Sequence, residues 1–292
     1  MIHIQVLDTT MVESKFTLEE QMMARAISNA TKARPRCMPN PWVGAVLVSS
    51  DGQTFDGFTQ EFGSGHAETV CLNEAGRKAQ GATLYVTLEP CSHSGKTGPC
   101  VERIIESRIS RVVIGMKDPD RQVCGEGIKS LQNAGVDVVV GVLEDLVAEQ
   151  LAPYVHHRNT GRPYVILKIA TTLDGKVAAP DGSSQWITGP EARREGHKLR
   201  AYSDAICVGR GTVISDNPQL TVRDWSADDD IDKNLDPRRI VLGSVPAEAA
   251  IHPCYEFRGD LFELLDELGN DGVLQLLVEG GASTYKAFHD LG

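Results

Sequence analysis

The spacing of apolar and polar residues predicts both helices and strands in this chain. Residues 17–32 are amphipathic, and Thr17 stands three residues before Glu20, as in a helical capping box. We therefore expect a helix over this stretch. Apolar runs typical of buried strands follow it at residues 42–49, 82–88, 111–116 and 136–142.

Helical patterns lie between these runs, at residues 66–79, 101–107 and 128–134. Strands that alternate with helices predict an α/β layered fold with a mostly parallel sheet. The alternation resumes after residues 161–163. Further strands are expected at residues 164–170, 205–208, 239–242 and 274–278, and further helices at 190–200 and 261–268.

The length of 292 residues is enough for two domains of ordinary size. The change of pattern near residues 150–162 marks the boundary between them. We expect one domain over residues 1–160 and a second over residues 161–292.

Composition and charge narrow the possible functions. Hydrophobic residues make up 41% of the chain and charged residues 24%, as in a globular protein. The net charge of −11 argues against nonspecific binding to nucleic acid or to an acidic membrane, because both need many cationic side chains. No apolar run approaches the roughly 18 residues of a membrane-spanning helix.

The cysteines and the N-terminus bear on location. Seven scattered cysteines, an odd number, do not suggest the disulfide framework of a secreted protein. The first residues show no basic stretch ahead of an apolar core, so we expect no signal peptide. The expected location is the cytoplasm.

The strongest chemical signal is a set of possible metal ligands. His66 is followed by Glu68, and Cys91 directly follows Pro90, with Cys100 further along. One imidazole and two thiolates suit a tetrahedral zinc that keeps its fourth position open for water. A His-x-Glu motif followed by Pro-Cys and a second Cys is typical of zinc deaminases, in which the glutamate moves protons. We expect His66 and Cys91 each to lie at a helix start.

Two simpler interpretations compete with a catalytic zinc. The histidine and the thiols can be ordinary core residues, or the zinc can be structural, with His93 as a fourth ligand. The cysteines are separated by eight residues where the general deaminase signature has two. This insertion carries Lys96, which is either a ligand for an anionic substrate group or a solvated loop lysine.

Four segments together resemble the deaminase half of the bifunctional riboflavin-biosynthesis deaminase/reductase family. These segments are residues 39–46, residues 66–68, residues 85–93 and Cys100. The resemblance implies a cytidine-deaminase-like, three-layer domain in which Asn40 contacts the pyrimidine; Asn40 is otherwise a turn residue between prolines. Many members have a histidine at the position of Thr59, so one substrate contact differs here.

The second half resembles the reductase of the same family, which has a dihydrofolate-reductase-like fold and uses NADPH. The segments concerned are residues 173–176, 184–188, 209–213, 216–218, 220–223 and 278–282, together with Arg200. Glycine-rich turns after strands, at 209–211 and 280–281, allow the backbone to approach phosphates. Family members usually continue beyond the position of Gly292, so we expect this domain to be incomplete.

The resemblance also implies residue roles in the second half. The cofactor residues it implies are Ala170, Trp186, Thr212, Asp216, Ser244 and Gly281. The substrate residues it implies are Ser184, Arg200, Leu220, Arg223 and Glu279. A guanidinium binds phosphate in bidentate fashion, so Arg200 and Arg223 suit a ribose phosphate.

The sequence thus predicts a bifunctional enzyme with zinc and NADPH as cofactors. It removes an amine from a diaminopyrimidinone ribosyl phosphate and then reduces the ribosyl group. The alternatives are a deaminase with an inactive reductase domain, a tRNA or other nucleic-acid deaminase, and a zinc-stabilised binding protein. By resemblance the protein is expected to be a homo-oligomer that binds a small phosphorylated pyrimidine, and neither nucleic acid nor a membrane.

Overall fold

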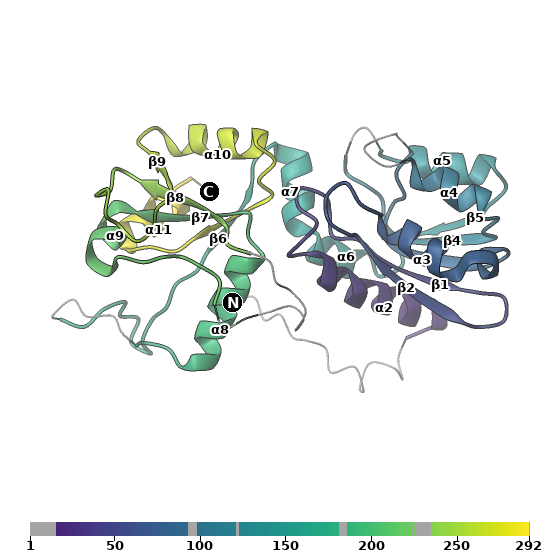
Figure 1. Ribbon diagram of the computed structural model, residues 1–292, viewed down its shortest axis with the longest axis horizontal. Helices are drawn as coiled ribbons and strands as arrows, with labels where there is room; N and C mark the ends of the chain where they lie inside the picture. The colour runs from purple at the N-terminus through teal and green to yellow at the C-terminus, as the bar shows by residue number, and fades with distance from the viewer. Residues whose placement is uncertain are drawn as a thin grey trace. The chain divides into compact units, whose positions relative to one another are not determined.

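The computed structural model describes residues 16–92, 98–120, 123–180, 186–223, 225 and 235–291. Within it the chain forms two compact units that divide after Leu151 (Figure 1). Among the helices of the described part, none combines the length and the apolar content needed to cross a bilayer.

The first unit contains a five-stranded mixed sheet in the order β2-β1-β3-β4-β5. Strand β1 pairs antiparallel with β2 and with β3, and the β3–β4 and β4–β5 pairs are parallel. The strands are β1 (Gly44–Val48), β2 (Thr54–Phe58), β3 (Thr83–Leu88), β4 (Arg111–Met116) and β5 (Asp137–Val140). Consecutive residues of β1, β3 and β4 are buried. Because successive side chains point to opposite faces, both faces of this sheet are covered, which gives three layers.

The helices of this unit pack closely on the sheet. They are α2 (Leu18–Ala33), α3 (Ala67–Ala75), the short 3₁₀ turn η1 (Gly76–Ala79), α4 (Cys100–Glu106), α5 (Glu126–Asn133) and α6 (Glu144–Gln150). The expected capping box of α2 is present, with Thr17 and Glu20 bonded reciprocally. A Cβ on Gly44 would lie 1.9 Å from the carbonyl oxygen of Ala26, so only glycine lets α2 approach β1 this closely.

Two expectations for this unit were wrong in part. The run at residues 136–142 was expected to be a buried strand, but β5 is an edge strand and 44% of Val140 is exposed. The sheet was expected to be mostly parallel, but β1 runs antiparallel to both of its neighbours. The chain reverses after β1 in a hairpin to β2, and the sequence analysis did not predict β2. Its sequence contains Asp56 and Gly57, which interrupt the apolar pattern that marks a strand.

The second unit contains a fully parallel sheet in the order β6-β10-β7-β8-β9. Its strands are β6 (Tyr164–Leu167), β7 (Ala205–Gly209), β8 (Arg238–Leu242), β9 (Tyr255–Phe257) and β10 (Gln275–Val278). Its helices are α7 (Ala152–Thr160), α8 (Pro190–Ala201), α9 (Arg210–Asp216), α10 (Leu261–Asn270) and α11 (Ala282–His289). All residues of β10 and the first four of β7 are buried, and two apolar clusters pack on the sheet.

Helix α7 belongs to this second unit, although the sequence pattern did not reveal it. The ring nitrogen Nε2 of buried His157 lies 2.9 Å from the carbonyl oxygen of Gly269, at the end of α10. A Cβ on Gly269 would lie 1.8 Å from the carbonyl oxygen of Gly161, so the end of α7 and the end of α10 touch through their backbones. In an open parallel sheet, ligands bind at the carboxyl ends of the strands.

Candidate metal centre and candidate binding cavity

Three side chains of the first unit form a cluster that suits a metal ion. The ring nitrogen Nδ1 of His66 lies 3.6 Å from the sulfur of Cys91 and 3.2 Å from the sulfur of Cys100. All three ligand atoms lie within 4.8 Å of one another. Zinc bonds of about 2.0 to 2.3 Å in a tetrahedron place ligand atoms about 3.3 to 3.8 Å apart. The donor set and its spacing therefore fit zinc.

Each ligand sits where an element begins or ends. His66 is the N-cap of α3, as expected. Cys91 follows β3 in a coil segment, so the expectation that it starts a helix was wrong. Cys100 instead is the first residue of α4. The N–H of Cys100 donates to the Cys91 sulfur at 3.4 Å, so the start of α4 still stabilises a thiolate at Cys91.

The two thiols differ in acidity. Hydrogen bonding from Cys100, His66 and the Cys100 N–H outweighs burial and lowers the pKa of Cys91 to about 4. The bond with Cys91, burial and the charge of Glu68 raise the pKa of Cys100. One thiolate thus forms readily, and the second needs a cation beside it. A divalent metal supplies that positive charge.

Glu68 lies in the first turn of α3, beside the ligands. Only 4% of the residue is exposed, and burial raises the pKa of its carboxyl. A buried carboxyl whose pKa is raised is suited to accept and return protons. This places a general acid and base candidate at the metal cluster.

Two residues near the start of β1, Asn40 and Thr59, make hydrogen bonds that fix the local backbone. The N–H of Asn40 donates to the carbonyl of Cys37 at 2.9 Å, and its carbonyl accepts from the Cys37 thiol at 3.3 Å, so Asn40 is a turn residue. The buried Thr59 hydroxyl accepts a hydrogen bond from the N–H of Val43 at 3.0 Å. Thr59 thus fixes the entry into β1.

Three candidate site residues named in the sequence analysis lie outside the described residues. They are His93 and Lys96 in the first unit and Ser184 in the second.

Glu89 precedes Pro90 and Cys91 and has a structural role that the sequence analysis did not identify. Its buried carboxylate accepts from three backbone N–H groups, those of Asp118, Gly125 and Ile128, at 3.3, 2.9 and 3.2 Å. The loop between β4 and α5 is thereby fixed to the turn that carries Cys91. The sequence did carry a signal for this role, because Glu89 directly follows an apolar strand. A carboxylate buried there needs several hydrogen-bond donors.

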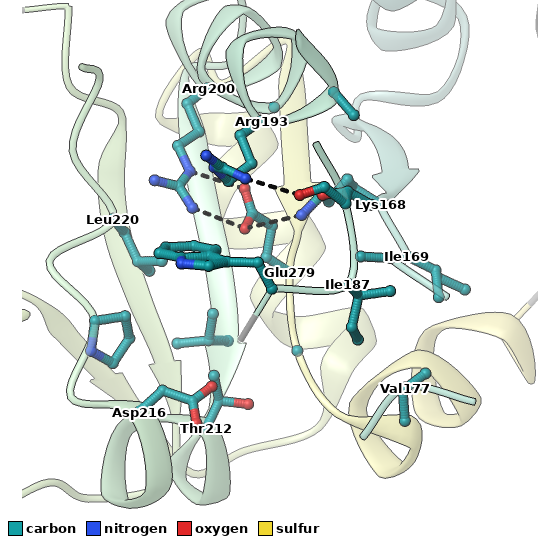
Figure 2. Close-up of a pocket in the computed structure, with 18 of the residues that line it drawn as sticks. Lys168, Ile169, Val177, Ile187, Arg193, Arg200, Thr212, Asp216, Leu220 and Glu279 are labelled. Carbon is teal, nitrogen blue, oxygen red and sulfur yellow. Dashed lines mark hydrogen bonds and ion pairs between the residues drawn. The ribbon is translucent and has the colours of Figure 1, made fainter. Parts of the chain in front are cut away.

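The second unit contains a cavity of about 830 Å³ at the carboxyl ends of β6, β7 and β10 (Figure 2). The structure brings together on its wall most residues expected to bind cofactor or substrate. These are Ala170, Trp186, Arg200, Thr212, Asp216, Leu220, Arg223, Glu279 and Gly281. Ser244, which follows β8, is not among the lining residues.

An ion cluster occupies one end of the cavity. The guanidinium of Arg200 binds Glu279 in bidentate fashion, at 2.8 and 2.9 Å, and donates to the carbonyl of Thr221 at 3.0 Å. The ammonium of Lys168 lies 3.8 Å from the same carboxylate. Figure 2 shows this cluster at one end and Thr212 and Asp216 at the other. Arg200 therefore orients Glu279, a role that the sequence did not suggest.

The charge of the cavity differs from that of the whole chain. Burial tends to raise the pKa of Glu279, but the bonds and charge of Arg200 outweigh it and hold that pKa below its ordinary value. Among the residues that the structure describes, the cationic lining residues are Lys168, Arg193, Arg194, Arg200 and Arg223, and the acidic ones are Asp216 and Glu279. A cavity with excess positive charge in an acidic protein suits an anionic ligand. Lys168 and Arg193 were missed, because a cation after a strand or on a helix is usually a surface residue.

Comparison with known proteins places both units in one family. The profile described as the cytidine and deoxycytidylate deaminase zinc-binding region matches residues 17–116, and the RibD C-terminal domain matches residues 163–292. The riboflavin biosynthesis protein RibD of Chlamydia muridarum is 38% identical over 92% of this chain and 82% of its own length. The chain belongs to the RibD family. The RibD protein of Escherichia coli is 42% identical over 83% of this chain and 68% of its own length.

Solved RibD structures show the same fold. The structure of Acinetobacter baumannii RibD, form 1, aligns with a TM-score of 0.86 and 37% identity, covering 94% of this chain and 83% of the other. The Thermotoga maritima deaminase/reductase aligns with a TM-score of 0.83 and 37% identity, covering 94% and 84%. The resemblance and fold class inferred from the sequence are confirmed. The chain is a bifunctional deaminase and reductase of riboflavin biosynthesis with a zinc-binding deaminase site.

Proposed function

We propose that this RibD family member carries out two consecutive steps on one phosphorylated pyrimidine. The first is hydrolytic deamination of 2,5-diamino-6-ribosylamino-4(3H)-pyrimidinone 5′-phosphate, by the first unit. The second is NADPH-dependent reduction of the ribosyl to the ribityl side chain, by the second unit, which begins with α7. The cluster of His66, Cys91 and Cys100 beside a buried Glu68 is the observation that carries the proposal.

In the deaminase, this chain's residues hold the metal and move protons. A zinc held by the three ligands would supply an acidified water. Glu68 is placed to accept a proton beside these ligands and to deliver it to the exocyclic amine. A carbon–oxygen bond forms, the carbon–nitrogen bond breaks and ammonia leaves. Asn40 and Lys96 are proposed to bind the pyrimidine and an anionic group of the substrate.

In the reductase, the cavity of the second unit orients cofactor and sugar. A reduced nicotinamide supplies the hydride. Arg223 is proposed to bind the ribose phosphate, with Ser184 and Leu220 beside the substrate. Arg200 and Glu279 are proposed to hold the substrate at the same end of the cavity. The cofactor residues are proposed to be Ala170, Trp186, Thr212, Asp216, Ser244 and Gly281. NADPH, a cytoplasmic location and a homo-oligomeric state remain parts of the proposal.

The test measures the two half-reactions separately on the purified protein. Ammonia release from the diaminopyrimidinone ribosyl phosphate reports deamination, and NADPH oxidation with the deaminated product reports reduction. We expect Glu68→Gln to abolish ammonia release while zinc content and NADPH oxidation stay unchanged. Glu74→Gln, at an exposed position of the same helix, is the matched control.

Each alternative gives a different result. A deaminase with an inactive second domain releases ammonia and does not oxidise NADPH. A zinc-stabilised binding protein shows no difference between the Glu68→Gln and Glu74→Gln variants. A nucleic-acid deaminase gives a salt-dependent gel shift with tRNA.

A further inference from the structure

The pairing of β6 with β10 changes at the edge of the cavity. The register runs from Tyr164 opposite Gln275 to Leu167 opposite Val278. One more bond follows in register, from the N–H of Lys168 to the carbonyl of Val278 at 3.1 Å. In a parallel ladder the next bond would run from the N–H of Gly280 to the carbonyl of Lys168.

A side chain stands in the place of that bond. The hydroxyl of Tyr285 accepts from the N–H of Gly280 at 2.9 Å and donates to the carbonyl of Lys168 at 2.7 Å. A direct bond would hold the two backbone atoms about 2.9 Å apart. With an oxygen between them they lie further apart, so the strands separate where the cavity opens. Both backbone groups keep a hydrogen-bond partner.

The position of this hydroxyl is fixed by packing. Tyr285 lies in the first turn of α11, and its ring packs against the apolar cluster on one face of the sheet. Burial is the main cause that raises the pKa of its phenol, so the group stays protonated and can donate. Tyr285 therefore holds the two strand ends at a fixed separation.

The two strand ends carry two members of the ion cluster, one cationic and one acidic. Lys168 follows β6 directly, and Glu279 follows β10 directly and precedes Gly280. Their charged groups lie 3.8 Å apart on the cavity wall, and Tyr285 lines the same cavity. A change in the separation of the strand ends moves these two side chains relative to each other.

We propose that Tyr285 is a positioning residue for the reductase, whose hydroxyl replaces a ladder bond and sets the spacing of Lys168 and Glu279. This inference rests on the proposed reductase function and adds a residue to it. Tyr285 acts through the backbone and leaves the reacting atoms to other groups. Its effect is on substrate binding, because the two side chains it spaces face the substrate end of the cavity.

The Tyr285→Phe variant tests the proposal, because it removes the hydroxyl and keeps the ring. We expect kcat/KM for reduction to fall about tenfold, as for the loss of two ordinary hydrogen bonds, with most of the fall in the KM of the ribosylated pyrimidine. The KM for NADPH and the rate of ammonia release stay within about twofold. Tyr255→Phe is the matched control, because its hydroxyl bonds Glu267 at the surface of the same unit.

A second measurement does not depend on catalysis. Residue-resolved hydrogen exchange of the Gly280 amide is expected to be slow in the wild type and faster in Tyr285→Phe. Equal exchange in the two proteins, or equal KM changes in Tyr285→Phe and Tyr255→Phe, overturns the proposal. A wild type that fails to oxidise NADPH refutes the proposed reductase function. The exchange result still decides whether the Tyr285 hydroxyl bonds the Gly280 N–H in place of the ladder bond.

Discussion

The metal centre and the cavity of the second unit are assembled in different ways. The metal centre takes its three ligands and its glutamate from residues 66 to 100, at the starts of two helices and the end of one strand. The cavity takes its lining from residues 168 to 285, mostly at strand ends and loops. The first site depends on which atoms are present, and the second depends on how the strand ends are held.

This difference predicts opposite responses to substitution. A site defined by a few donor atoms is lost when one donor is lost. A cavity defined by many backbone segments also loses function through residues that act only on the backbone, such as Tyr285. One chain carries both types of site. In a variant of one site, the activity of the other site therefore serves as an internal control.

The largest effect is expected from removal of a metal ligand. Cys100→Ser replaces a thiolate that binds zinc with a hydroxyl that binds it weakly. We expect zinc content to fall to a small fraction of one per chain and ammonia release to fall at least about a thousandfold. NADPH oxidation is expected to stay within about twofold. Metal analysis and the two separate assays measure this, with Cys124→Ser, an exposed thiol of the same unit, as the control. Retained zinc and deamination would refute the assigned ligand set.

A smaller but still large effect is expected from Arg200→Ala. The substitution leaves the carboxylate of Glu279 buried without its bidentate partner, which costs about 3 kcal/mol of unfolding free energy. We expect reductase activity to be lost and ammonia release to continue. Arg238→Ala, which breaks an exposed ion pair with Asp271, is expected to cost less than about 1 kcal/mol. Denaturant unfolding measures both, and equal costs would contradict the role assigned to the buried pair.

The same pair gives a pH dependence with a defined sign. The folded-state pKa of Glu279 lies below its ordinary value of 4.5, because Arg200 outweighs the effect of burial. The stabilisation is therefore fully present above the ordinary pKa and is lost as pH falls through the folded-state pKa. Without Arg200, burial raises the pKa of Glu279, so the difference in unfolding free energy between the wild type and Arg200→Ala is expected to be largest near neutral pH and to shrink steadily as the pH falls. A difference that grows on acidification would exclude this pairing.

How far the sequence predicted each site follows from the same contrast. Zinc ligands are chemically rare, so His66, Cys91 and Cys100 could be predicted from residue type and spacing, and they lie together. The cavity residues came from family resemblance, because a lone Arg or Trp has no distinctive spacing. The strands β1, β3 and β4 were predicted because they are continuously apolar. Strand β2 was missed because Asp56 and Gly57 interrupt its apolar pattern, and β9 because it has only three residues.

The functions of Lys168, Glu89 and Tyr285 could not be predicted from the pattern. Each depends on bonds to backbone groups or charges that are distant in the sequence, such as the bond from Tyr285 to the carbonyl of Lys168. Sequence periodicity reports which face a residue occupies, and it carries no information on which distant N–H or C=O the residue meets. The supporting groups of both sites were therefore visible only in the structure.

The smallest of the expected effects tests whether the metal centre is as local as its ligands suggest. Three backbone N–H groups donate to the two oxygens of Glu89. In Glu89→Gln an NH₂ group, which cannot accept, replaces one of these oxygens, so at least one N–H loses its partner. The turn that carries Cys91 is then held less firmly, and loss of such supporting bonds typically costs 10–100-fold in metal affinity. We expect a loss of about tenfold in zinc competition against a chromophoric chelator, with reduction unchanged.

Glu126→Gln is the matched control, because this exposed carboxylate at the start of α5 pairs with Lys129 at the surface. If Glu89→Gln and Glu126→Gln bind zinc equally well, the metal centre is self-sufficient and the loop after β4 contributes nothing to it. If Glu89→Gln alone loses affinity, the metal centre also depends on residues distant in the sequence. The contrast with the cavity is then one of degree, because both sites rely on backbone groups held by a single buried side chain.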